Sequence, residues 1–98
     1  MSAYMIADVG IINLERYEAY RLAVRPAIER NGGRYLARGG DVKVLEGTWN
    51  PTRLVIVEFP TLKQAENFYQ SSEFLAAREL RQNAAMVNMI LADGSEPA

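Results

Sequence analysis

Period-two alternation of side chains, interrupted by two stretches of helical spacing, restricts the fold of this chain more than any other feature. A β-strand that presents one face to a core needs a period of two, and a helix needs apolar residues three or four positions apart. The helical stretches are expected over residues 13–31 and 61–80. The strand-like segments are 3–9, 34–38, 53–59 and 87–92.

The resulting order of elements is β-α-β-β-α-β, which is the order of the ferredoxin-like split βαβ fold. We therefore predict an α+β protein with an antiparallel sheet and two helices on one sheet face. The chain has 98 residues, which fits one domain and is too short for two. We expect that domain over residues 1–94 and a disordered tail over residues 95–98.

Local signals set the ends of the first helix. Asn13 is expected to be the N-cap, because its side chain can accept a hydrogen bond from a free backbone amide of the first turn. Pro26 should kink the helix or restart it, since proline removes one amide donor. Gly32 and Gly33 are expected to end it.

Similar signals divide the second half of the chain. Thr61 and Gln64 form a capping-box pattern at the start of the second helix. Ser71 and Ser72 are expected to break that helix, with Ser72 capping its continuation. Between the second and third strands, residues 42–46 should continue in extended form.

The two faces of the expected sheet differ in polarity. One face mixes Ile6, Ile56 and Ile90 with the carboxylates Asp8 and Glu58. Leaving such an apolar patch exposed is unusual for a soluble monomer, so we predict a homodimer in which this face packs on a second copy. A partly polar cavity is then expected between or beside the two sheets. The other face is wholly apolar and should be covered by both helices; it comprises Met5, Ala7, Val9, Val55, Val57, Phe59, Val87, Met89 and Leu91.

Charge and residue types exclude several classes of function. The formal net charge is −1, from 11 basic and 12 acidic residues without a basic run, so neither nucleic acid nor an anionic membrane is an expected partner. Histidine and cysteine are absent, which excludes thiol and histidine-dependent catalysis and the usual zinc, copper and haem sites. No cofactor or metal is expected. The sequence has neither a signal-peptide pattern nor a membrane-spanning stretch, so a cytoplasmic location is expected.

Several short segments occur in an order that resembles a known family. They are the N-terminal Ala3-Tyr4-Met5-Ile6-Ala7, Tyr17-x-x-Tyr20-Arg21, residues 32–40 (GGRYLARGG), Leu45-Glu46-Gly47, Val57-Glu58-Phe59-Pro60 and Ala65-x-x-x-Tyr69. Together they resemble the domain-of-unknown-function 1330 family of the dimeric α+β barrel superfamily. The resemblance implies the ferredoxin-like fold and a dimer, but no established reaction. Members usually carry Tyr where this chain has Phe74, so a role for that hydroxyl does not carry over.

Three charged residues are the first candidates for chemistry. Arg38 lies at a strand end beside Gly39 and could bind a carboxylate or enolate through two hydrogen bonds. Glu58 and Asp8 are carboxylates on the mixed face, where an enclosed apolar cavity would raise the pKa and suit a general base or acid. The structural alternatives are ion pairs, such as one between Arg38 and Glu58.

Aromatic residues form a second group of candidates. Tyr20 and Tyr69 fall on helical faces, where an aromatic side chain usually belongs to the core, although their hydroxyls could contact a ligand. Trp49 lies in a loop and is interpreted as a dimer contact or a lid, with the dimer contact favoured.

Three functions remain open from the sequence. The first is a cofactor-independent enzyme of the proton-transfer, oxygenase or isomerase type, in which Glu58 or Asp8 moves a proton and Arg38 holds an anionic group. The second is a binding module that uses the same cavity for a small organic, anionic molecule without catalysis. The third is a structural dimer whose polar residues serve only the interface. Whether the protein is an enzyme is left open.

Overall fold

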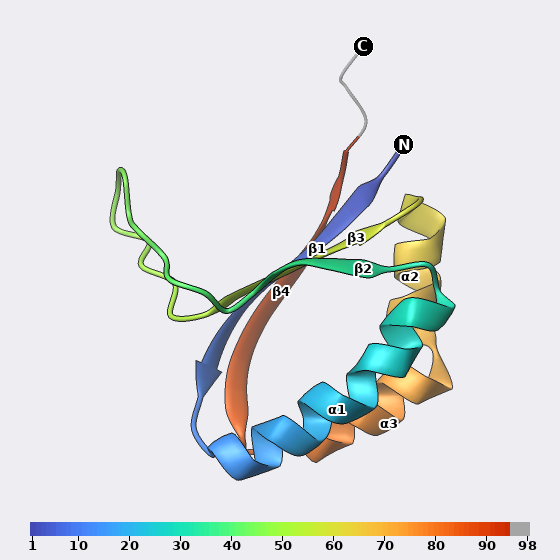
Figure 1. Ribbon diagram of the computed structural model, residues 1–98, viewed down its shortest axis with the longest axis horizontal. Helices are drawn as coiled ribbons and strands as arrows, with labels where there is room; N and C mark the ends of the chain where they lie inside the picture. The colour runs from blue at the N-terminus through green and yellow to red at the C-terminus, as the bar shows by residue number, and fades with distance from the viewer. Residues whose placement is uncertain (95–98) are drawn as a thin grey trace.

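The computed structural model describes residues 1–94, so the expected tail at 95–98 lies outside the described residues. Strands and helices follow one another as β-α-β-β-α-α-β (Figure 1). Their bounds are β1 Ala3–Ile11, α1 Leu14–Arg30, β2 Arg34–Arg38, β3 Leu54–Phe59, α2 Leu62–Gln70, α3 Ser72–Leu80 and β4 Ala85–Asp93.

The four strands form one antiparallel sheet in the order β2-β3-β1-β4. All the helices lie on one side of this sheet, and residues 1–94 place no layer on the other side (Figure 1). This arrangement confirms the predicted α+β, ferredoxin-like fold. No helix among residues 1–94 is long and apolar enough to cross a membrane.

Helix α1 begins where the capping signal predicted. The Asn13 side chain accepts a hydrogen bond from the Arg16 amide at 3.1 Å. Pro26 neither ends nor restarts the helix, which continues to Arg30. Gly32 then reverses the chain with a φ of +79°, a conformation that glycine adopts without strain.

Two details of the second half differ from the prediction. Helix α2 begins at the expected Thr61 cap, but Ser71, not Ser72, caps α3: its hydroxyl accepts from the Phe74 amide at 3.1 Å and donates to the Phe68 carbonyl at 2.7 Å. Residues 42–46 form no strand. They belong to a segment of residues 39–53, here called the arm, that extends away from the sheet between β2 and β3 (Figure 1).

Strand pairing places side chains on the two sheet faces as predicted. Met5 is paired with Val57 and Leu91 on the side of the helices. Ile6 is paired with Ile56 and Ile90 on the opposite side, here called the outer face. The helix side carries the core, and its fully buried large side chains are Ile28, Val57, Phe59, Phe68 and Phe74.

Candidate functional site

A cavity lies between the sheet and helix α1, on the side of the sheet that carries the core. Its floor consists of apolar side chains from β1, β3 and β4, and its walls include three tyrosines and four arginines. The floor residues are Met5, Ala7, Val9, Val55, Val87 and Met89. The polar wall residues are Tyr17, Tyr20, Tyr35, Arg21, Arg38, Arg53 and Arg81.

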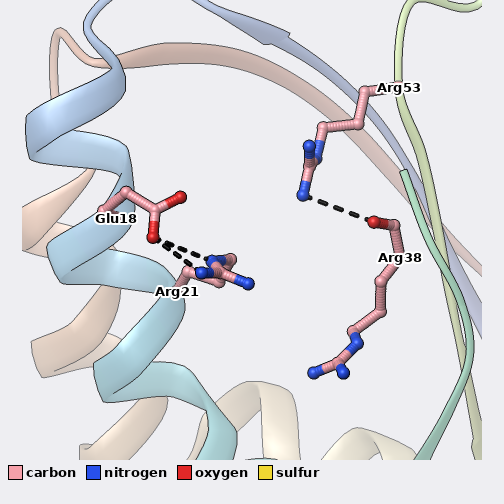
Figure 2. Close-up of polar contacts among 4 residues, drawn as sticks. All are labelled: Glu18, Arg21, Arg38 and Arg53. Atoms are coloured by element: carbon pink, nitrogen blue, oxygen red, sulfur yellow. Dashed lines mark hydrogen bonds and ion pairs between the residues drawn. The ribbon is translucent and has the colours of Figure 1, made fainter. Parts of the chain in front are cut away.

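The cavity is narrow inside and open at one side. Its interior volume is about 30 Å³, so the side chains of the walls nearly fill it and a ligand larger than water would have to displace some of them. Arg21 and Arg38 are exposed side chains, whereas Arg53 and Arg81 are half-buried. Figure 2 shows Arg21, from α1, and Arg38 and Arg53, from the sheet side, reaching into the same space.

A β-bulge in β2 brings Arg38 into this cavity. Tyr35 is paired with Val57 and Arg38 with Val55, both on the side of the helices, because the register shifts between Tyr35 and Ala37. The extra residue, Leu36, has no partner in β3. A regular strand would direct side chains three positions apart to opposite faces. The bulge therefore places the Arg38 guanidinium over the Tyr35 ring, 4.8 Å from its centroid.

Arg53 is held against the backbone of Gly39. A Cβ atom at Gly39 would lie 2.6 Å from the Cζ atom of Arg53, and the Gly39 φ of +82° favours glycine on its own account. The Arg53 Nη2 atom donates to the Arg38 carbonyl at 3.4 Å (Figure 2). Its Nε atom is buried and has no hydrogen-bond partner among the described residues.

A chain of cations and aromatic rings crosses the cavity wall. The Cζ atom of Arg53 lies 5.8 Å from the centroid of the Tyr17 ring, and the Tyr17 and Tyr20 centroids are 5.6 Å apart. Arg81 then donates from Nη1 to the Tyr20 hydroxyl oxygen at 2.9 Å. Burial raises the pKa of Tyr20 to about 12, although the neighbouring Arg81 acts in the opposite direction. Tyr20 is therefore protonated at neutral pH.

The described residues leave most of the positive charge of the cavity without an ion-pair partner. Arg21 pairs with Glu18 at 2.7 Å (Figure 2), but Arg38, Arg53 and Arg81 form no ion pair with any residue in the described part of the chain. No Asp or Glu is among the described residues that line the cavity. Guanidinium groups in such a setting bind carboxylates and other oxyanions, often through two parallel hydrogen bonds.

The structure places the predicted site residues in different regions. Arg38 and Tyr20 line the cavity. Glu58 and Asp8 lie on the outer face, paired with Tyr4 and Leu54 of the neighbouring strands. The Arg38, Glu58 and Asp8 side chains therefore do not converge on one site.

The polar contacts of Glu58 and Asp8 also differ from the prediction. Glu58 accepts a hydrogen bond from Arg34 Nε at 2.8 Å, and in the single chain this contact holds its pKa below the usual range, in the direction opposite to the rise expected in an enclosed cavity. The expected ion pair between Glu58 and Arg38 is replaced by this pair with Arg34. Asp8 accepts from the Thr52 amide at 3.2 Å, which fastens the end of the arm to β1.

The remaining candidates lie outside the cavity. Tyr69 lines a separate apolar groove with Ile90 and Leu91, and its hydroxyl accepts from Arg78 Nη1 at 3.3 Å. Trp49 lies on the arm and is 64% exposed. Phe74 is fully buried, with its ring centroid 4.8 Å from that of Phe68, so it belongs to the core.

Sequence reasoning missed three of the four arginines, namely Arg21, Arg53 and Arg81. Arg53 continues the period-two alternation of Val55 and Val57, and that pattern alone could have placed it on the side of the helices. Arg81 carries no such signal, because it is the C-cap of α3 and reaches the cavity only through the packing of α3 beside α1. The described residues contain no cluster of acidic, histidine or cysteine side chains suited to a metal ion.

Comparison with known proteins gives a family and a fold. The model of the family described as "Domain of unknown function (DUF1330)" matches residues 2–95. No curated protein matches the chain.

Several solved structures are similar. RPA0582, a protein of unknown function from Rhodopseudomonas palustris, is 22% identical, with a TM-score of 0.76 over 98% of this chain and 84% of that one. SnoaB, a cofactor-independent oxygenase from Streptomyces nogalater, is 8% identical, with a TM-score of 0.68 over 98% of this chain and 95% of that one. A dimeric protein of unknown function with a ferredoxin-like fold from Bacteroides fragilis is 15% identical, with a TM-score of 0.54 over 94% of this chain and 95% of that one. At these identities the similarity concerns the fold alone.

Proposed function

We propose that this chain, which belongs to the DUF1330 family, binds a small organic anion in the cavity between α1 and the sheet. The observation that carries the proposal is the uncompensated positive charge of Arg38, Arg53 and Arg81 above an apolar floor. An anionic ligand with an apolar body complements both properties at once.

The state of Arg53 gives the proposal its energetic basis. A buried donor without an acceptor costs about 1–3 kcal/mol, and more when the group is charged. No described residue accepts a hydrogen bond from Arg53 Nε. A carboxylate of the ligand would supply the acceptor and neutralise the charge, so part of the penalty returns as binding energy.

Catalysis by the same cavity is the second candidate, favoured by the protonated Tyr20 hydroxyl. With a pKa of about 12, Tyr20 is a hydrogen-bond donor and not a base at neutral pH. Together with Arg81 it would stabilise an enolate or phenolate, the kind of intermediate that proton-transfer, isomerase and cofactor-independent oxygenase reactions form. The cavity's described lining offers no carboxylate base, which ranks anion binding above catalysis.

The homodimer predicted from the mixed face stays part of the proposal. Ile90 is 60% exposed on the outer face, where Ile6 is paired with both Ile90 and Ile56. A second copy packed on this face would cover these side chains. The similar protein from Bacteroides fragilis is described as dimeric, which supports this assembly by analogy of fold. The cytoplasmic location and the absence of nucleic-acid and membrane partners stay predictions.

The direct test measures the binding of benzoate and of its neutral analogue benzamide by isothermal titration calorimetry. Benzoate should bind and benzamide should not. Arg53→Gln should weaken the binding of benzoate at least about tenfold, which corresponds to the free-energy contribution of one charge-assisted hydrogen bond. Arg16→Gln, an exposed arginine of α1 outside the cavity, is the matched control and should bind as the wild type does. Equal binding of both probes, or an equal loss in both variants, would refute the proposal.

A further inference from the structure

We infer that the ligand has two oxygen-bearing ends, a carboxylate held by Arg38 and Arg53 and a second oxygen acceptor held by Tyr20 and Arg81, joined by a flat apolar body. This inference rests on the proposed anion-binding function and names the class of molecule. The fitting class comprises aromatic dicarboxylates and aromatic acids with a second oxyanion at the far end of the ring.

The two anchors belong to opposite sides of the cavity floor. Arg38 ends β2 and Arg53 immediately precedes β3, which are neighbouring strands. Arg81 lies on the side of β4, where it also lines a polar groove with Ala85 and Val87. Strand β1 separates β3 from β4, and two strand spacings amount to roughly 10 Å. We therefore expect a single carboxylate to be too short to contact both anchors.

The first anchor supplies donors that the protein leaves unused. Among residues 1–94 the Nε atom of Arg53 has no acceptor, and the Arg38 guanidinium lies over the face of the Tyr35 ring. Neither side chain forms an ion pair among residues 1–94. Two guanidiniums of this kind match the two oxygens of a carboxylate.

The second anchor is a hydroxyl whose proton is free to be donated. Tyr20 accepts from Arg81, and no acceptor for its own proton occurs in the described part of the chain. Arg81 likewise has no acidic partner there. The pair therefore offers a neutral donor backed by a cation, which suits a carboxylate, phenolate or enolate oxygen.

The region between the anchors favours a flat apolar body. The Tyr17 and Tyr20 rings, tilted by 47° to one another with centroids 5.6 Å apart, form one wall, and the floor below is made of small or aliphatic side chains such as Ala7 and Val9. Aromatic rings stack on such walls at little entropic cost. Because three unpaired cations surround the space, a dianion balances the charge better than a monoanion.

The test compares benzene-1,4-dicarboxylate with benzoate by isothermal titration calorimetry on the full chain. The wild type should bind the dicarboxylate at least about tenfold more tightly, since the second end adds one charge-assisted contact. In Arg81→Gln and in Tyr20→Phe this preference should fall to about one, because each variant removes one group of the second anchor. Thermal unfolding of both variants establishes that they are folded.

The outcomes separate this inference from the proposed function. Benzoate binding that depends on Arg53, with no preference for the dicarboxylate in the wild type, overturns the two-ended ligand and leaves anion binding intact. If Arg81→Gln and Tyr20→Phe both keep the preference for the dicarboxylate over benzoate, Tyr20 and Arg81 do not form the second anchor, and anion binding again stays intact. If the wild type binds neither probe, the proposed function itself is refuted.

Discussion

The guanidinium of Arg38 lies over the ring of Tyr35, 4.8 Å from its centroid, although the two residues are three positions apart on one strand. On a regular strand they would face opposite sides of the sheet. The bulge at Leu36 changes the parity of β2, so that Arg34 pairs with Glu58 on the outer face while Arg38 enters the cavity. One extra residue thus decides that the two arginines of this strand have different surroundings.

Replacing Arg53 by methionine should separate stability from binding. Methionine preserves much of the apolar stem and removes the half-buried charge, so the free energy of unfolding should be unchanged or higher by up to about 2 kcal/mol. Benzoate should lose its stabilising effect on the variant. Urea denaturation with and without benzoate measures both quantities, and a loss of stability greater than about 2 kcal/mol would show that Arg53 is structural.

A side chain at position 39 should displace Arg53. Gly39→Ala combines a left-handed backbone with a Cβ atom 2.6 Å from the Arg53 guanidinium, so it should lower stability by about 1–3 kcal/mol and weaken benzoate binding. Two other glycines of the arm are matched controls. Gly47→Ala tests backbone strain alone, because Gly47 has a φ of +86° but open space where a Cβ atom would lie. Gly40→Ala tests neither effect, because Gly40 has open space and no left-handed backbone. Both should bind benzoate normally, and only Gly47→Ala should lose stability.

The raised pKa of Tyr20 predicts a loss of stability in alkali. Its pKa is about 12 in the folded protein and about 10 in the unfolded chain, so the folded state keeps the proton longer. The resulting stability is fully present below pH 10 and is lost as the pH rises from 10 to 12. Tyr20→Phe should remove that part of the pH dependence. Chemical denaturation at pH 8, 10 and 11 measures the free energy of unfolding of both proteins. If it falls equally with pH in the wild type and in Tyr20→Phe, the loss of stability does not come from Tyr20.

Glu58→Gln should not affect binding in the cavity. Glu58 lies on the outer face and pairs with the exposed Arg34, and such a pair at the surface usually contributes little to stability. Its affinity for benzoate should equal that of the wild type. A tenfold loss of affinity for benzoate, measured by calorimetry, would show that Glu58 contributes to the binding site and would contradict the separation of the two faces.

A charge on the outer face should disrupt the proposed dimer. Ile90→Lys places a cation where a second copy would bury an isoleucine, and an unpaired buried charge is strongly destabilising. Analytical ultracentrifugation should find a dimer for the wild type and a monomer for the variant. Leu22→Lys is the control, because Leu22 is 71% exposed on α1, on the other side of the sheet. A wild type that sediments as a monomer refutes the dimer.

Local sequence patterns determined most of the fold. The alternation in β1, β3 and β4 predicted which residues face the helices, and strand pairing reproduces those faces, with Met5, Val57 and Leu91 together. Caps at Asn13 and Thr61 predicted where two helices begin. These features could be read from the sequence because a strand period and a cap depend on residues within a few positions of one another.

The site was decided by the tertiary structure. The sequence singled out Arg38 and Tyr20, but it placed Arg38 with Glu58 because a bulge leaves no mark in the period-two pattern. Arg81 reaches Tyr20 across 61 positions of sequence through the packing of α3 beside α1. Which face is apolar follows from side-chain periodicity, whereas which cations share one cavity depends on register and on helix packing, and neither is a local property of the chain.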